Sequence, residues 1–147
     1  MNSISQIVEV MNVAFEKNLK FEMPVNGTSM LPFIHAGDLV TLEKITNSQI
    51  KKKDVIFYKR DNGQYVLHRV YKIKNNCLFI LGDNQLNVEK NVRYDQVIAK
   101  MVSYKTKNKT IPVTSFAYRF KVSLWNVYFI RCIVLKAKWL LLKLKRK

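Results

Sequence analysis

The chain has 147 residues, 48% of them hydrophobic, and its 26 lysine and arginine residues against 10 acidic residues give a formal net charge of +16. This length supports one domain with a hydrophobic core and is too short for two domains of ordinary size. The two cysteines, Cys77 and Cys132, have neither the spacing of a metal site nor that of a redox motif. We therefore expect one domain that holds no metal and no cofactor.

Residues 3–18 are predicted to form an amphipathic helix. Ser3 and Gln6 make a capping box, and an apolar face follows at helical spacing: Ile4, Ile7, Val8, Met11 and Phe15. We expect this face to pack on the domain's own sheet. Because residues 1–20 lack both a basic start and a continuous apolar stretch, they are expected to be neither a signal peptide nor a membrane anchor.

A mainly β, antiparallel domain is predicted between about Phe21 and Lys109. Asn62-Gly63 lies between two of the expected strands and predicts a hairpin with a type I′ turn, because both residues tolerate a positive φ. In the strand after this turn, His68 shares its face with apolar residues. The predicted strands are 21–25, 38–42, 54–59, 64–74, 77–81 and 96–105.

The chain after residue 113 has a different composition. Residues 116–147 contain nine of the basic residues and no acidic residue, which leaves 17 basic against 10 acidic residues in the rest of the chain. Residues 114–147 are therefore predicted to be a basic amphipathic C-terminal helix appended to a domain over residues 1–113. The helical periodicity is clearest over 122–146, where a charge-free stripe is formed by Ile130, Ile133, Val134, Ala137, Leu140, Leu141 and Leu144.

This basic segment has no uncharged stretch long enough to cross a bilayer. Its longest uncharged stretch, 122–130, has nine residues, whereas about 20 are needed. A cationic helix with an apolar stripe, together with Trp125, Tyr128 and Trp139, favours peripheral contact with an anionic membrane through residues 122–146. Packing against protein is the alternative. Nucleic acid is not favoured, because the basic residues lie in no nucleic-acid-binding motif.

Three short motifs carry the chemistry that the sequence predicts. The first runs from Asn26 to Pro32 and contains Ser29, the second is His68-Arg69, and the third is Gly82-Asp83-Asn84. A serine hydroxyl is a good nucleophile at neutral pH only when a base removes its proton and a third group orients that base. His68 and Asp83 are the residue types that supply these two roles.

In this order the motifs resemble the signal peptidase I superfamily, in the branch where histidine replaces lysine as general base. The resemblance spans roughly residues 24–113 and implies an antiparallel, β-barrel-like catalytic fold. It implies that Ser29 is the nucleophile, His68 the general base and Asp83 the acid that orients His68. The loop that would hold substrate and oxyanion consists of Gly27, Thr28, Met30 and Pro32.

Two positions depart from the family pattern. Members often carry a second aspartate a few residues after the third motif, where this chain has Asn87 and Glu89. Gly27 has no hydroxyl to help hold an oxyanion, so this task passes mostly to the backbone N–H of Ser29.

The function expected from the motifs is that of a serine endopeptidase which cleaves a precursor or leader peptide. Activity should rise from mildly acidic to neutral pH, around the reference histidine pKa of ~6.5. The expected location is cytoplasmic or peripheral on a membrane. Two alternatives remain open: an inactive pseudo-peptidase that binds a peptide, and a self-cleaving regulator. The second is less favoured, because DNA-damage repressors of this fold use lysine as base and carry a DNA-binding domain.

Overall fold

The computed structural model describes residues 4–46, 49–107 and 109–144, so Ser3 of the predicted capping box and residues 145–146 of the predicted C-terminal helix lie outside it. The helices are α1 (Ile4–Glu16), α2 (Phe116–Trp125), α3 (Tyr128–Leu144) and the short 3₁₀ helix η2 (Tyr94–Gln96). The strands are β1 (Phe21–Pro24), β2 (Leu39–Lys44), β3 (Val55–Lys59), β4 (Tyr65–Lys74), β5 (Cys77–Leu81), β6 (Glu89–Val92), β7 (Val97–Lys105) and β8 (Thr110–Pro112).

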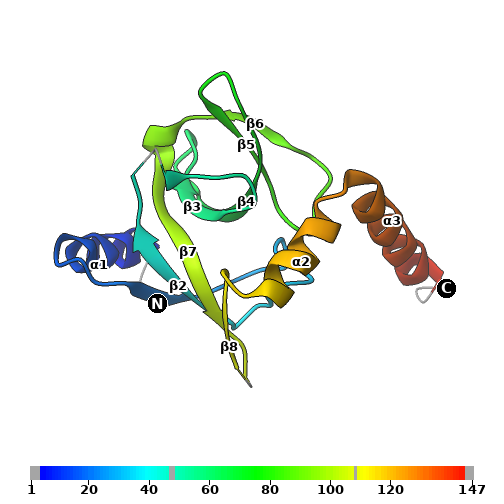
Figure 1. Cartoon of the computed structure of the whole chain (residues 1–147), viewed down its shortest axis with the longest axis horizontal. Helices are drawn as coiled ribbons and strands as arrows, with labels where there is room; N and C mark the ends of the chain where they lie inside the picture. Colours follow the sequence, from blue (N-terminus) through cyan, green and yellow to red (C-terminus); the bar gives the residue numbers. More distant parts are fainter. Residues whose placement is uncertain (1–3, 47–48, 108, 145–147) are drawn as a thin grey trace.

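The strands form one antiparallel sheet in the order β1-β2-β7-β3-β4-β5-β6, with β8 paired to β7. In Figure 1 the strands curl around a common centre, with α1 at one side and α2 and α3 at the other. The predicted mainly β fold is confirmed, and each of the six predicted strands is found within two residues at either end. Strands β6 and β8 were not predicted; they pair with β5 and β7.

The β3–β4 hairpin is confirmed, but its predicted type I′ turn is wrong. Gly63 has a φ of 85°, whereas Asn62 does not have a positive φ. The N–H of Arg60 donates to the carbonyl of Gln64 at 2.8 Å and that of Gly63 to the carbonyl of Arg60 at 2.9 Å. These bonds close a three-residue loop in which glycine takes the left-handed position.

Both faces of the central strands are covered, because adjacent residues of β3 enter two different buried clusters. Val55 and Phe57 join the larger cluster, which also contains Val8, Met11 and Phe15 of α1. Ile56 and Tyr58 join the smaller cluster with Val70, Leu78, Ile80 and Val92. The predicted packing of the N-terminal helix on the sheet is therefore confirmed for Val8, Met11 and Phe15, whereas Ile4 of the predicted face is 42% exposed. The site residues on β4 lie between two cores.

The C-terminal segment is two helices rather than one continuous helix. Helix α2 ends at Trp125, and α3 starts at Tyr128. Tyr118 and Val122 of α2 are buried in the larger cluster, so the first of these helices contributes to the core of the domain. Among the described residues, no helix is long and apolar enough to cross a membrane.

Candidate active site

Ser29 lies at the start of a turn that is fixed to the core by its neighbours. Met30 and Ile34 are buried in the larger cluster, and the N–H of Ile34 donates to the Met30 carbonyl at 3.1 Å. The Asp38 carboxylate accepts from the N–H of His35 at 2.8 Å and so closes the next turn, residues 35–38. Ser29 itself is partly buried. In the described part of the chain its N–H donates to no acceptor, which leaves that donor available to an oxyanion.

The third motif binds the Ser29 loop through Asn84. The N–H of Asn84 donates to the carbonyl of Ser29 at 2.8 Å, and its side-chain Nδ2 donates to the carbonyl of Thr28 at 3.2 Å. Strand β4 pairs with β5 in a register that sets Arg69 opposite Leu81. One position further along that register, Gly82 comes opposite His68. The third motif directly follows β5, the strand paired with β4 next to His68. It therefore connects the Ser29 loop to this part of the sheet.

Gly82 leaves no room for a side chain at this junction. A Cβ built there would lie 2.8 Å from the carbonyl oxygen of Ser29 and 2.7 Å from Oε1 of Gln85. The Gln85 side chain is able to move, whereas the Ser29 backbone is held by Asn84. Glycine at this position is therefore a steric requirement of the Ser29 loop.

With Ser29 in its predicted role of nucleophile, Gly82→Ala is expected to lower kcat/KM about 100-fold, because a displacement of the nucleophile by about 1 Å costs roughly that much. The Gln85→Ala variant should be close to wild type. Gly82→Ala/Gln85→Ala should remain impaired, because it removes the clash with the Gln85 side chain but not the clash with the Ser29 carbonyl oxygen. Full recovery in the double variant would show that Gln85, not the serine loop, sets the requirement. Rates on one peptide substrate, compared across the three variants, make this measurement.

His68 lies on β4, opposite Ile56 of β3. Its side chain is on the strand face that the sequence predicted to be apolar. It is 4% exposed, and its ring lies 6.5 Å from the ring of Tyr58. Burial, helped by the positive charge of Arg60, lowers the pKa of His68 to about 4, against the opposing charges of Glu89 and Asp83. The ring is therefore neutral at pH 7 and able to accept a proton. In the described chain it is not hydrogen bonded to Ser29 or to Asp83.

Asp83 has a different partner from the one that the resemblance implied. Its Oδ1 and Oδ2 accept from Nε and Nη2 of Arg69 at 2.8 and 2.6 Å, and both side chains are at most 1% exposed. His68 and Arg69 are adjacent on one strand, so their side chains leave opposite faces of the sheet. The carboxylate of Asp83 is therefore bound on the Arg69 side, and its expected contact with the His68 ring is not formed.

The Arg69–Asp83 pair is enclosed by aromatic rings. The Arg69 guanidinium lies 5.4 Å from the centre of the Phe33 ring and 5.7 Å from that of Tyr118, and it donates to the Tyr118 hydroxyl at 3.1 Å. Burial alone would lower the pKa of Arg69, but the Asp83 carboxylate and Tyr118 outweigh it and hold that pKa above its ordinary value. The pair thus remains charged and fixes the third motif in place.

The C-terminal helices also contact Asp83. The Trp125 Nε1 donates to the Asp83 carbonyl at 2.8 Å, and Nη2 of Arg131 lies 3.7 Å from Oδ1 of Asp83. Arg131 is 1% exposed, and its Nε and Nη1 have no hydrogen-bond partner among the described residues. Burial lowers the pKa of Arg131. These contacts tie the start of α3 to the third motif.

Glu89, which the sequence marked only as a departure from the family pattern, lines the same cavity as His68. Its carboxylate accepts from the Tyr58 hydroxyl at 2.7 Å and from Nη2 of Arg60 at 2.6 Å. Burial raises the pKa of Glu89, but the hydrogen bonds from Arg60 and Tyr58 outweigh it and bring that pKa below its usual value. Its charge acts on His68 more strongly than that of Asp83 does. The sequence did offer a signal for Glu89, because it lies six residues after Asp83, in the region where family members often carry a second aspartate.

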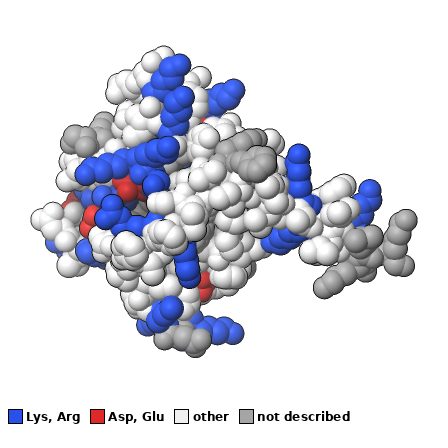
Figure 2. All heavy atoms as spheres, turned by 45° about the vertical axis from the view of Figure 1, so that its right-hand side comes forward, with Lys and Arg blue, Asp and Glu red and all other residues white. Residues whose placement is uncertain are grey.

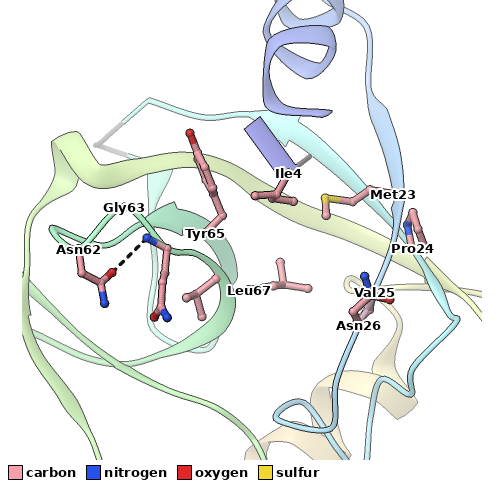
Figure 3. Close-up of a pocket in the computed structure, with 11 residues that line it drawn as sticks. Ile4, Met23, Pro24, Val25, Asn26, Asn62, Gly63, Tyr65 and Leu67 are labelled. Atoms are coloured by element: carbon pink, nitrogen blue, oxygen red, sulfur yellow. Dashed lines mark hydrogen bonds between the residues drawn. The ribbon is translucent and has the colours of Figure 1, made fainter. Parts of the chain in front are cut away.

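A groove of about 640 Å³ runs between α1, the end of β1 and the β3–β4 hairpin. Figure 3 shows Met23, Pro24 and Asn26 on one side of it and Tyr65 and Leu67 on the other. Among the described strands, β1 pairs only with β2, and residues 65–68 of β4 pair only with β3. The groove is therefore bordered by two unpaired strand edges, one leading to Ser29 and the other to His68.

Gly27, Thr28 and Pro32 complete the predicted substrate loop. Gly27 has a φ of 89°, in the left-handed region that favours glycine. Thr28 is exposed and is held through its carbonyl by Asn84. Pro32 follows a cis peptide bond. No group of histidine, cysteine or acidic side chains in the described residues is arranged to hold a metal ion.

Comparison with known proteins gave one result on the family. A model described as Peptidase S24-like matches residues 2–102, a range that contains Ser29, His68, Asp83 and Glu89. No curated protein matches the chain.

Proposed function

The chain belongs to the Peptidase S24-like family, which supports a serine peptidase, and we propose that it is an endopeptidase of the signal peptidase I type that cleaves a precursor or leader peptide. The observation that carries this proposal is the groove between two unpaired strand edges, which lead to Ser29 and to His68. An extended peptide pairs with such edges through its main chain. Neither residue lines the groove itself, and we infer that a bound peptide extends from it toward Ser29 along β1 and toward His68 along β4.

The chemistry that we propose is acyl transfer. Neutral His68 removes the proton of Ser29 as its Oγ attacks the peptide carbonyl, and the protonated ring then gives a proton to the leaving amine. In the second half, His68 takes a proton from a water molecule as the water attacks the acyl carbon, and the protonated ring returns a proton to Oγ of Ser29 as the ester bond breaks. The free N–H of Ser29 donates to the oxyanion.

The negative charge that supports protonated His68 is proposed to come from Glu89. Glu89 shares a cavity with His68 and is kept anionic by Arg60 and Tyr58. Asp83 is instead a positioning residue, because its carboxylate is taken by Arg69 while its neighbour Asn84 holds the serine loop.

The pH dependence is expected to differ from that of an ordinary histidine. With its pKa lowered to about 4, His68 is already neutral at pH 5, so kcat/KM should be flat from pH 5 to 8 and fall only below that range. Glu89→Gln removes a charge that favours the protonated ring and should move the midpoint to lower pH. Arg60→Gln removes a charge that disfavours it and should move the midpoint to higher pH.

Proton NMR of the two histidines measures these midpoints without any substrate, with His35 as internal reference. Asp61→Asn, on the same hairpin, is the control and should leave His68 unchanged. Shifts of the same sign in Glu89→Gln and Arg60→Gln would contradict the proposed charge arrangement.

The proposed activity is tested with the wild type and Ser29→Ala, each offered a diverse peptide pool, with new termini read by mass spectrometry. Cleavage by the wild type alone, with a common residue pattern at the new ends, is the expected result. Identical peptide maps would count against cleavage of general peptides. Binding of a pool member by both proteins without cleavage would establish a pseudo-peptidase instead. A change of intact mass on incubation without peptide would establish a self-cleaving regulator.

A further inference from the structure

Most of the exposed apolar surface of the described chain lies on the two C-terminal helices. Of 16 large apolar side chains that are exposed, 11 belong to residues 116–142. The sequence placed this surface at 122–146, but in the structure it begins earlier, at Phe116, which is 85% exposed.

Helix α2 has two apolar faces, of which only one packs on the domain. Tyr118 and Val122 enter the core, and Trp125 binds the third motif. Phe116, Phe120 and Leu124 recur every four residues on the opposite face and are exposed. The rings of Phe116 and Phe120 stack on each other at 6.2 Å. The outer face of α2 is therefore apolar and has no packing partner among the residues that the structure describes.

Helix α3 presents its charge-free stripe away from the domain. At its start, Arg131 is buried and Cys132 and Leu135 are partly buried, so these positions face the protein. The stripe residues lie about half a turn away and are exposed: Ile130, Ile133, Val134, Leu140 and Leu141. Figure 1 shows α3 projecting from the body of the molecule. The stripe is not used for packing on the domain.

The charge around this surface has one sign. Helices α2 and α3 contain no acidic residue, and Lys136 and Lys138 flank the stripe on its two sides. The lysine loop 51–53 joins the same region, because Nζ of Lys53 donates to Oγ of Ser123 at 2.9 Å. Figure 2 shows basic side chains on the projecting helix and over the visible face, with few acidic atoms among them.

We propose that the outer helical surface, formed by the exposed apolar residues of α2 and α3 and their flanking lysines, docks on an anionic lipid bilayer. Apolar side chains enter the headgroup boundary, and the lysines meet lipid phosphates. A second copy would bring the same positive charge to the contact and would be repelled. Nucleic acid would leave the apolar stripe exposed to water.

Charge is tested by partition of the full chain into vesicles of phosphatidylcholine with phosphatidylglycerol and into vesicles of phosphatidylcholine alone. Binding is expected only with phosphatidylglycerol and should weaken in high salt. Lys136→Gln/Lys138→Gln/Lys143→Gln should bind about 100-fold more weakly, at roughly fivefold for each lysine. The control Lys72→Gln/Lys74→Gln/Lys90→Gln makes the same change in net charge at exposed positions of β4 and β6, outside the two C-terminal helices. It should bind like the wild type.

The apolar contribution is tested with Leu140→Ser/Leu141→Ser, which should bind at least about tenfold more weakly. Val10→Ser/Val13→Ser on α1 removes comparable exposed apolar surface and should have no effect. Equal losses in the two lysine triples would overturn the proposal in favour of net charge alone. A dimer in solution that Leu140→Ser/Leu141→Ser makes monomeric, with vesicle binding unchanged, would overturn it in favour of self-association. Circular dichroism confirms that each variant is folded.

Discussion

Ser29→Ala, His68→Ala and the double variant are expected to show the same residual rate of peptide cleavage, about 10⁴-fold below the wild type. A nucleophile and its base act as one unit, so removal of either loses the whole contribution and removal of the second loses nothing more. The rate that remains comes from substrate binding and from the Ser29 N–H, which alanine also provides. The measurement is kcat/KM on one peptide from the cleaved pool.

The matched control is His35→Ala, since the chain has only two histidines and the His35 side chain is 63% exposed. It should retain wild-type activity. If His68→Ala kept activity within tenfold of the wild type while Ser29→Ala did not, another group would be the base. If the double variant were much slower than either single variant, the two residues would act independently.

Asp83→Ala is expected to lower the free energy of unfolding by about 3–5 kcal/mol, because it leaves the Arg69 guanidinium buried without its carboxylate. The effect is increased by Arg131, whose buried guanidinium also faces Asp83 at 3.7 Å. Activity should fall with stability, since Asn84, which holds the Ser29 loop, directly follows Asp83. Urea unfolding followed by circular dichroism gives the free energy.

Two variants make this prediction specific. Asp83→Ala/Arg69→Met removes both charges of the pair and should be more stable than Asp83→Ala alone, because an apolar side chain tolerates the site better than an unpaired charge. Asp61→Ala removes the carboxylate of the exposed Arg93–Asp61 pair and should change stability little. A stability loss in Asp83→Ala no larger than in Asp61→Ala would show that the buried pair contributes no more than a surface one.

The sequence was sufficient wherever the deciding interaction is local. Hydrophobic periodicity marked α1, short apolar and β-branched runs marked six of the strands, and Asn62-Gly63 marked the hairpin, although its turn type depended on the register of β3 with β4. The three motifs marked Ser29 and His68 as candidates through their residue types and through the resemblance that their order along the chain carries. The charge-free stripe of α3 was also evident from spacing alone.

Tertiary structure decided which groups meet. Alternation along β4 separates His68 from Arg69, but only the path of the chain after β5 brings Asp83 to the Arg69 side and Glu89 to the cavity of His68. The pKa of His68 depends on burial and on Arg60 and Glu89, which are distant in sequence from one another.

The direction of the α3 stripe was likewise settled by the fold. The contacts of Trp125 and Arg131 with Asp83 orient the C-terminal helices, and they leave the apolar stripe outward. Residue types and their spacing thus determined the secondary structure, because it depends on near neighbours, and the motif resemblance identified the candidate nucleophile and base. The partners of the acids and the exposed faces of the helices depend on contacts between distant segments, which only the folded chain specifies.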